Sequence, residues 1–440
     1  MPRLLLLLPT TTYRTQAFLA AARRLGVEVT VASEEASSLT LLNPRGLLRL
    51  DFSDPDRAAR DAAKFAAKYP IDAVVPVDDQ VTEAAAVICR TLSLRHNSVE
   101  SVMAARLKHR MRELLERAGV PSPRYRLSSL DEDPVHLARQ VDYPCVVKPL
   151  ALAGSRGVMR ANNEAEFVQF VGRLEKILEA EAAERSAASN QETRGQSPPR
   201  DRPETPPLAS QDLPRRSREG PRQFLVEDFI PGSEVALEGL LRRGELSVLA
   251  LFDKPDPLDG PFFEETLYVT PSRFPASVQA QIANCSAQAT RALGLVEGPV
   301  HVELRVNDAG PWVIEINARS IGGLCSRVLR FGVGISLEEL IIRHALEAEF
   351  SAPERERQPA GVMMIPIPCA GLLREVRGLV EAKAVSGIQE VTLTARPGEE
   401  LVPLPEGSRY LGFIFAQAAS PEAVEAALRA AHARLEFVIK

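Results

Sequence analysis

The first hundred residues alternate short apolar runs with stretches of helical periodicity. Residues 4–8 are all leucine, residues 73–77 form a further apolar run, and residues 27–32 (VEVTVA) give a second strand signal. Helical patterns lie between these runs, one ending at residue 25 before Gly26 and another over residues 58–68. Short runs that are apolar throughout are typical of strands buried on both faces of a parallel sheet. The order therefore predicts an α/β domain with a parallel sheet and helices on both sides.

The middle of the chain has a helical pattern over residues 103–119 that ends at a glycine, a strand signal at 145–148, and a helix from about residue 163. From residue 179 to 221, Ser, Arg, Glu, Gln and Pro dominate and large apolar residues nearly vanish. Such a segment buries too little surface to offset its ordering entropy. We therefore predict a disordered insertion at 180–221, without a catalytic role.

The last eighty residues carry strand patterns at 361–367, 388–393 and 411–416 and an amphipathic helix over 421–435. They predict a small α+β unit. The resulting division is an N-terminal domain at 1–104, a core at 105–350 with the insertion at 180–221, and a C-terminal domain at 351–440.

A hairpin pattern near residue 310 carries the strongest chemical signal. Residues 301–306 (HVELRV) and 312–317 (WVIEIN) alternate apolar and polar positions around the turn-rich segment 307–311. The strand period of two places Glu303 on one face of the first strand, and Glu315 and Asn317 on one face of the second. Glu303 then lies opposite Glu315. Like charges about 5 Å apart destabilise a sheet unless something offsets them, and oxygen ligands of this kind suit Mg²⁺. The alternative is a solvated hairpin whose outer face carries acids.

Composition narrows the class of protein. Apolar residues make up 45% and charged residues 25% of the 440, which is ordinary for a globular protein. The net charge of −5 favours neither nucleic acid nor an anionic membrane as a partner. The five cysteines form neither a disulfide ladder nor a metal-spaced set, which fits a reducing compartment. No run approaches the ~20 apolar residues of a membrane span. We expect a cytoplasmic protein.

Several segments, in their order, carry a family resemblance: the helix with Lys108, which ends in AGVP at 118–121, VVKP at 146–149, ALAGSRGV at 151–158, VEDFIPGSE at 226–234, VEL at 302–304, and IEINAR at 314–319. Together they resemble the ATP-grasp ligases from about residue 105 to 349. The resemblance implies an ATP-grasp fold, combining α/β and α+β parts. Its parts are an N-terminal parallel-sheet domain, a nucleotide-binding core of two subdomains, and a small C-terminal α+β domain.

The resemblance also implies how ATP and two Mg²⁺ ions (or Mn²⁺ in their place) are held. Lysines after a strand and glycine-rich backbone suit phosphate oxygens, and the glycine loop is a candidate lid. The expected nucleotide contacts are Lys108 and Lys148 at the phosphates, Ser155, Arg156 and Gly157 over the triphosphate, Glu227 and the main chain of Asp228 and Ile230 at the base, and Glu234 at the ribose. The expected metal ligands are Glu303, Glu315 and Asn317.

The ending Asn-Ala-Arg…Gly-Gly at 317–323 resembles the branch with L-amino acid ligases and carnosine synthase. There, Arg319 with Gly322 and Gly323 is expected to hold a carboxylate or acyl phosphate. The loop 252–265 is expected to reach the amine substrate through Lys254, Glu264 and Glu265. The implied catalytic residues are Arg319, Lys148 and His301.

The implied reaction is ATP-dependent ligation of a small-molecule carboxylate to an amine through an acyl phosphate, giving ADP and phosphate. No residue is assigned as the base for the amine. Two alternatives stay open: a carboxylase acting through carboxyphosphate, and a nucleotide-binding protein without turnover. A two-carboxylate glycosidase fits least, because it leaves the lysines without a purpose. Homodimers are common in this family.

Overall fold

The computed structural model describes residues 1–10, 12–35, 43–194, 222–347 and 354–440. An N-terminal parallel sheet has the strand order β3-β2-β1-β4. Residues 4–7 within β1 are completely buried, which confirms the leucine run as an internal strand. The elements here are β1 (Arg3–Leu7), α1 (Thr15–Leu25), β2 (Glu28–Ser33), β3 (Leu47–Arg49), α2 (Pro55–Ala66), β4 (Ala73–Pro76), η1 (Asp79–Val81) and α3 (Thr82–Thr91).

The helix predicted at 103–119 is wrong in one respect, because the structure breaks it in two. Helix α4 (Val99–Arg106) ends before Leu107, which has an extended backbone, and α5 (Lys108–Arg117) begins directly after it. The Lys108 N–H donates to the Leu150 carbonyl oxygen at 3.0 Å instead of continuing the helix. The break therefore places Lys108 at the start of α5, beside the glycine-rich loop.

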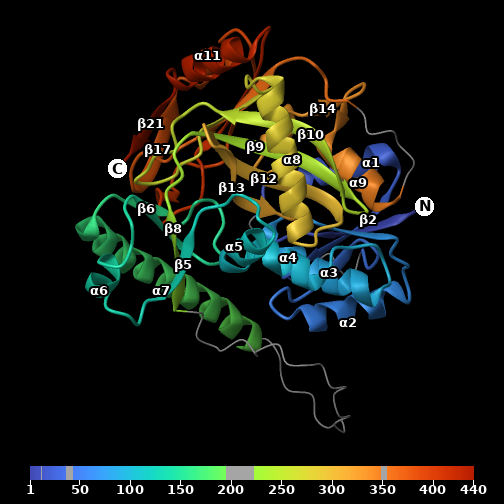
Figure 1. Cartoon of the computed structure of the whole chain (residues 1–440). Coiled ribbons are helices and arrows are strands. Elements are labelled where there is room, and N and C mark those ends of the chain that lie inside the picture. Colours follow the sequence, from blue (N-terminus) through green and yellow to red (C-terminus); the bar gives the residue numbers. More distant parts are fainter. Residues whose placement is uncertain (11, 36–42, 195–221, 348–353) are drawn as a thin grey trace.

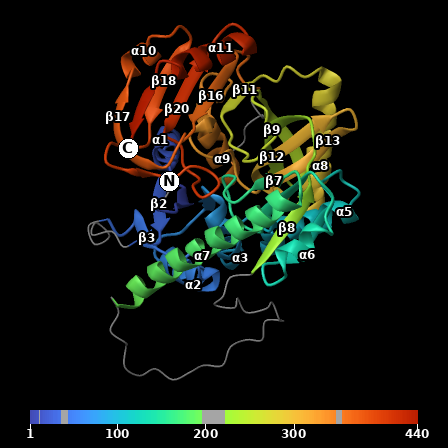
Figure 2. The same cartoon turned by 90° about the vertical axis from the view of Figure 1, so that its left-hand side faces the viewer.

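A small antiparallel sheet follows, with the order β5-β8-β6-β7 and helix α7 packed on β6 and β7 (Figure 2). Its elements are β5 (Tyr125–Ser129), α6 (Pro134–Ala138), β6 (Cys145–Pro149), β7 (Met159–Ala161), α7 (Glu164–Arg194) and β8 (Gln223–Asp228). Helix α7 continues through Arg194, so the start of the predicted insertion at 180–221 is helical. Alanine and glutamate, both strong helix formers, are frequent there. The rest of that insertion, 195–221, lies outside the described residues.

The large sheet has the order β13-β12-β9-β10-β11-β16-β20-β18, and helix α8 crosses it over β9, β10 and β13 (Figure 1). Its strands are β9 (Ser233–Arg242), β10 (Glu245–Lys254), β11 (Leu267–Thr270), β12 (Glu297–Asn307), β13 (Gly310–Asn317), β16 (Ala360–Ile365), β18 (Ile388–Leu393) and β20 (Gly412–Gln417). The remaining elements are α8 (Ala276–Ala292), η2 (Cys325–Val328), β14 (Arg330–Phe331), β15 (Ile335–Ser336), α9 (Leu337–Ala345), β17 (Gly371–Arg377), α10 (Leu379–Lys383), β19 (Glu400–Leu401), α11 (Pro421–His432) and β21 (Glu436–Ile439).

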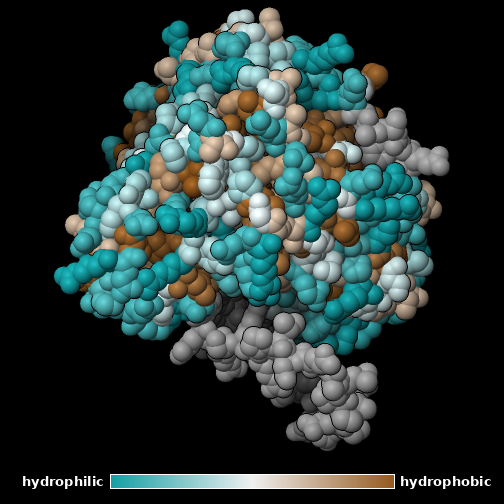
Figure 3. All heavy atoms as spheres, viewed as in Figure 1, coloured by the Kyte–Doolittle hydropathy of each residue, from teal (hydrophilic) through white to brown (hydrophobic). Residues whose placement is uncertain are grey.

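The C-terminal strands β16, β20 and β18 continue the sheet that carries the predicted hairpin. The predicted fold class is confirmed, while the domain boundaries at 104 and 350 stay predictions. Among the described residues, no helix is long and apolar enough to cross a membrane. Hydrophilic residues cover most of the face drawn in Figure 3, with hydrophobic patches between them.

Candidate active site

A cavity of about 680 Å³ lies between the small sheet and the large sheet. Its walls include apolar side chains from both sheets, among them Val146, Phe229 and Ile314, which form a surface suited to a flat ring. Ten of the side chains predicted for nucleotide, metal or substrate line this one cavity: Lys108, Lys148, Ser155, Glu227, Asp228, Ile230, Glu234, Glu265, Glu303 and Glu315. The fold thus brings together segments that are up to two hundred residues apart in the sequence.

A buried ion network forms one wall of the cavity. Lys148 Nζ lies 2.6 Å from Glu227 Oε2, and Arg112 donates to both Glu227 oxygens at 2.8 and 3.1 Å. Burial lowers the pKa of Lys148 to about 8, against the opposing effect of Glu227. Burial alone would raise the pKa of Glu227, but Arg112 and Lys148 hold it below its usual value. Both Glu227 oxygens thus lie against protein cations, and the expected contact of Glu227 with the exocyclic amine stays a prediction.

Arg112 is a site residue that the sequence analysis missed. It is fully buried, and it also donates to the Ile314 carbonyl oxygen at 2.6 Å, so it joins α5, the small sheet and β13. The sequence did contain a signal for Arg112: it lies four residues after Lys108 on the same helix, so the two side chains share one helix face. Lys108 Nζ donates to the Leu152 carbonyl oxygen at 3.0 Å and lies 3.5 Å from Glu315 Oε2.

The main chain predicted to bind the nucleobase already makes hydrogen bonds within the protein. The Asp228 N–H donates to the Arg124 carbonyl oxygen at 3.0 Å, and the Ile230 carbonyl oxygen accepts from Arg305 Nη1 at 2.8 Å. A nucleobase at this segment therefore has the other polar atoms of Asp228 and Ile230 available to it, the Asp228 carbonyl and the Ile230 N–H.

The glycine-rich loop is divided between the cavity and the C-terminal segment. Ser155 lines the cavity with a positive φ of 56°. Arg156 and Gly157 do not: Arg156 Nε donates to the Glu406 carbonyl oxygen at 2.8 Å, and the Gly157 N–H donates to the Pro405 carbonyl oxygen at 2.9 Å. The structure therefore places these two predicted nucleotide contacts against the loop before β20, because the main-chain oxygens there satisfy their donors.

The hairpin has the predicted register. Glu303 pairs with Glu315 and His301 with Asn317, with a bulge next to Glu303, although the turn is shorter than the predicted 307–311. The two acids are offset by protein cations. Glu303 Oε2 lies 3.4 Å from Lys254 Nζ, and Glu303 Oε1 lies 3.3 Å from His301 Nε2. Burial opposes charge on His301, but hydrogen bonds to Glu238 and Glu303 raise its pKa to about 9.

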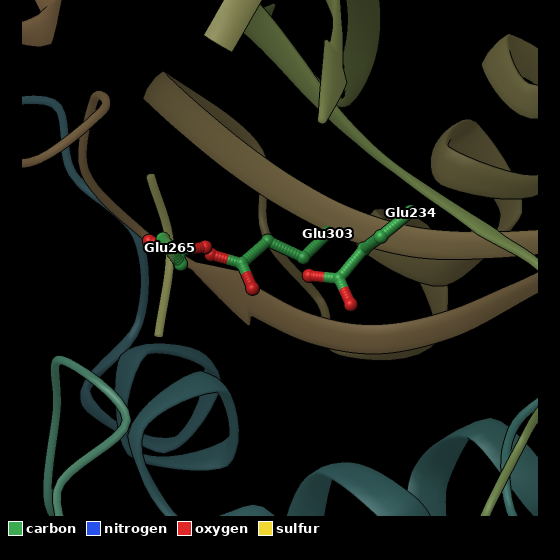
Figure 4. A group of neighbouring side chains, drawn as sticks. All are labelled: Glu234, Glu265 and Glu303. Carbon is green, nitrogen blue, oxygen red and sulfur yellow. The ribbon is translucent and has the colours of Figure 1, made fainter. Parts of the chain in front are cut away.

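Three carboxylates, Glu234, Glu265 and Glu303, point toward one another from β9, the loop before β11, and β12 (Figure 4), with ligand oxygens within 4.8 Å of one another. Lys254 Nζ lies 2.8 Å from Glu234 Oε1 and also pairs with Glu265. Burial would lower the pKa of Lys254, but the three acids hold it well above its usual range. Lys254 therefore acts as the counter-cation of these three acids, and its predicted contact with the amine substrate stays a prediction.

A second oxygen cluster involves the predicted metal ligand Asn317. The oxygen position of its amide lies 3.3 Å from Glu315 Oε1 and 3.3 Å from Asp79 Oδ1. If the Asn317 amide is turned over so that its oxygen and nitrogen exchange places, its N–H₂ group donates to both acids. Otherwise the amide oxygen and two carboxylate oxygens lie close together and require a cation between them. Hard oxygen donors in this number match what Mg²⁺ prefers. Glu315 and Asn317 therefore offer oxygen atoms that fit Mg²⁺ together with Asp79, while Glu303 lies in the cluster with Glu234 and Glu265. A shared magnesium site at Glu303, Glu315 and Asn317 stays a prediction.

Arg319 is not part of the cavity lining described above, and it is held by Asp79 of η1 in the N-terminal part of the chain. Its Nε and Nη2 atoms lie 2.9 and 2.7 Å from Asp79 Oδ2. Gly323 has a φ of +57°, and a Cβ there would lie 3.0 Å from the Phe413 ring, so only glycine fits. Gly322 has open space around it. Sequence reasoning missed Asp79, because nothing local links it to residue 319.

The fully buried Glu238 is a further missed residue. Its Oε2 atom accepts from His301 Nδ1 at 3.2 Å and from the Ile321 N–H at 3.0 Å, so β9 supports both the hairpin and the turn after β13.

Comparison with known proteins agrees with this geometry. The model of the ATP-grasp N-terminal domain matches residues 19–95, and that of the ATP-grasp domain matches residues 210–328. The L-amino acid ligase C-terminal domain 2 matches residues 363–440. The chain therefore contains ATP-grasp domains, and the proteins similar to it include amino acid ligases.

Two relatives and one solved structure show the extent of the likeness. An alanine–anticapsin ligase of Bacillus subtilis is 24% identical over 65% of this chain and 56% of its own length. Carnosine synthase 1 of Gallus gallus is 33% identical over 42% of this chain and 20% of its own length. The crystal structure of an L-amino acid ligase from Bacillus licheniformis has a TM-score of 0.76 at 24% identity, covering 100% of this chain and 99% of the other. The chain thus spans about half, or less, of the two named ligases.

Proposed function

We propose that this protein is an ATP-dependent ligase that joins a carboxylate, such as that of an amino acid, to an amine, giving ADP and phosphate. The observation that carries the proposal is the convergence, in one cavity, of phosphate-type lysines and of hairpin acids in the predicted register. The match of residues 363–440 to the C-terminal domain of L-amino acid ligases supports the amine as the acceptor.

In the proposed reaction, a carboxylate oxygen attacks the γ-phosphorus of ATP, which forms an acyl phosphate and releases ADP. The amine then attacks the acyl carbon, loses a proton, and displaces phosphate, so that a C–N bond replaces the C–O bond. Both reactants are anionic at the first step, so the protein must position them and stabilise their charge.

The cavity offers suitable groups for that task. Lys108 and Lys148, both buried, provide cationic donors for phosphate oxygens. Mg²⁺, with Mn²⁺ as a substitute, would be held by Glu303, Glu315 and Asn317 and would neutralise charge on the phosphates. Because protein cations already face Glu303 and Glu315, metal binding competes with the lysines for these acids.

Arg319 and Glu265 are proposed to contact the substrates. A guanidinium binds a carboxylate or an acyl phosphate through two parallel hydrogen bonds. Glu265 lines the cavity and accepts from the Tyr268 hydroxyl at 2.8 Å, so its carboxylate is fixed where it can attract an ammonium group.

The test of the reaction is a phosphate-release screen with ATP and Mg²⁺ over pairs of amino acids. The ligase proposal expects ADP and phosphate only when a carboxylate and an amine are both present, with an amide product by mass spectrometry. Release that needs bicarbonate but no amine would instead identify a carboxylase. No release with any pair would indicate a nucleotide-binding protein without turnover.

The metal assignment has its own variant. Glu315→Ala should leave the protein folded but reduce turnover by at least ~10²-fold, as for the loss of a group that stabilises charge. Glu245→Ala, at the exposed start of β10, is the matched control and should keep wild-type turnover. Near-normal turnover of the Glu315 variant would remove this residue from the metal site.

A further inference from the structure

The turn that follows β13 is held by the N-terminal sheet from two sides. The Arg14 guanidinium donates to Ser320 Oγ at 2.5 Å and to the Val77 carbonyl oxygen at 2.9 Å. Asp79 pairs with Arg319 through one oxygen, and its other oxygen lies 3.3 Å from the Asn317 amide. Two loops of one domain therefore fix the turn that carries Arg319.

These loops leave neighbouring strands at one edge of the sheet. Arg14 follows β1 and Asp79 follows β4, and β1 and β4 are parallel partners. In the order β3-β2-β1-β4, strand β1 lies between β2 and β4. The chain continues from β1 to β2 on one side of β1, and β4 is added on the opposite side, so the strand order reverses at β1. The crevice outside the carboxyl ends of strands at such a switch point is where open α/β sheets bind ligands. Here Arg319 enters that crevice.

The hydrogen bonds that the Arg319 guanidinium makes within the protein decide which of its N–H groups remain for a substrate. A guanidinium has five N–H donors. Asp79 Oδ2 accepts from Nε at 2.9 Å and lies 2.7 Å from Nη2, and the Ser320 carbonyl oxygen accepts from Nη1 at 3.0 Å. With the close Nη2 contact included, these contacts with described residues engage three donors, so at least one N–H remains on each terminal nitrogen. A pair of adjacent donors is the arrangement that binds a carboxylate or phosphate bidentately.

We propose that Asp79 is a positioning residue for the ligation: it turns the remaining N–H edge of Arg319 toward the reacting acyl group and orients the Asn317 amide. The N-terminal domain then completes the active site. This inference rests on the proposed function. Partners of this kind, one step removed from the reacting atoms, typically change activity by roughly 10- to 100-fold.

The test compares Asp79→Asn with Asp78→Asn, using an amino acid pair that the wild type turns over. Asp79→Asn keeps the shape but removes the charge, so kcat should fall by roughly 10- to 100-fold while KM for ATP stays within about 2-fold. Asp78→Asn removes a charge that acts on Arg319 more weakly, without a hydrogen bond to it, and should lower kcat by no more than about 2-fold. Asp79→Glu should recover part of the lost rate.

A double-mutant cycle with Arg319→Lys separates positioning from a structural role. If Asp79 acts through Arg319, the Asp79→Asn and Arg319→Lys losses should be strongly non-additive. The Asp79→Asn variant should remain folded at the assay temperature, as its melting curve checks. Unchanged kcat, additive losses, or an equal loss in Asp78→Asn would each overturn the inference while leaving the ligase proposal intact. If the wild type itself releases no ADP with any pair, the proposed function fails and this inference falls with it.

Discussion

Removal of the buried Arg112 guanidinium should destabilise the protein far more than removal of an exposed arginine on the same helix. In Arg112→Met, Glu227 loses two charge-assisted hydrogen bonds and the Ile314 carbonyl oxygen loses one. Removing one partner of a buried ion pair typically costs 3–5 kcal/mol. Because Lys148 remains 2.6 Å from Glu227, we expect the lower end, about 3 kcal/mol.

The matched control is Arg117→Met, seven tenths exposed in the last turn of α5, where its pair with Glu113 is a surface contact. It should cost about 0.5 kcal/mol or less. Urea unfolding can be followed through Trp312, the single tryptophan, which lies on β13 two residues before Ile314. With an m-value of about 3 kcal/mol/M, the Arg112 midpoint should fall by about 1 M. Coinciding midpoints for the two variants would refute the reasoning.

Two further predictions concern the cavity wall and the turn after β13. Since burial lowers the pKa of Lys148 to about 8, the free enzyme loses this charge as the pH rises through that value, so KM for ATP should increase between about pH 7 and 9. Lys148→Arg, which stays protonated, should show a flat profile, and a flat wild-type profile would contradict the assignment. Gly323→Ala should cost about 1–3 kcal/mol, because its positive φ and the Phe413 ring both oppose a Cβ. Gly322→Ala, with open space around its Cα, should melt like the wild type, and equal melting temperatures for both variants would argue against this explanation.

Local patterns were sufficient for the features that depend on near neighbours in the sequence. Glu303 lies opposite Glu315 as predicted from the strand period of two, although the structure reaches this pairing through a shorter turn and a bulge next to Glu303. The all-leucine first strand and the parallel N-terminal sheet follow from apolar run length. The family resemblance follows from the order of motifs, and the matches to ATP-grasp models confirm it.

Periodicity was misleading where a contact from elsewhere interrupts a local preference. The pattern over residues 103–119 continues across Leu107, yet the Leu150 carbonyl oxygen captures the Lys108 N–H and splits the helix. In α7, helix formers at 180–194 outweigh the polar composition that predicted disorder.

The amino-acid sequence by itself determined the fold class, the facing position of Glu303 and Glu315, and ten of the residues that line the cavity, because each of these depends on periodicity or motif order. Only the tertiary structure decided the charge partners: Arg112 with Glu227, Lys254 with three acids, and Asp79 with Arg319. Ion pairs between distant segments have no periodic signature, since a buried charge accepts any opposite charge that the fold brings within hydrogen-bond distance.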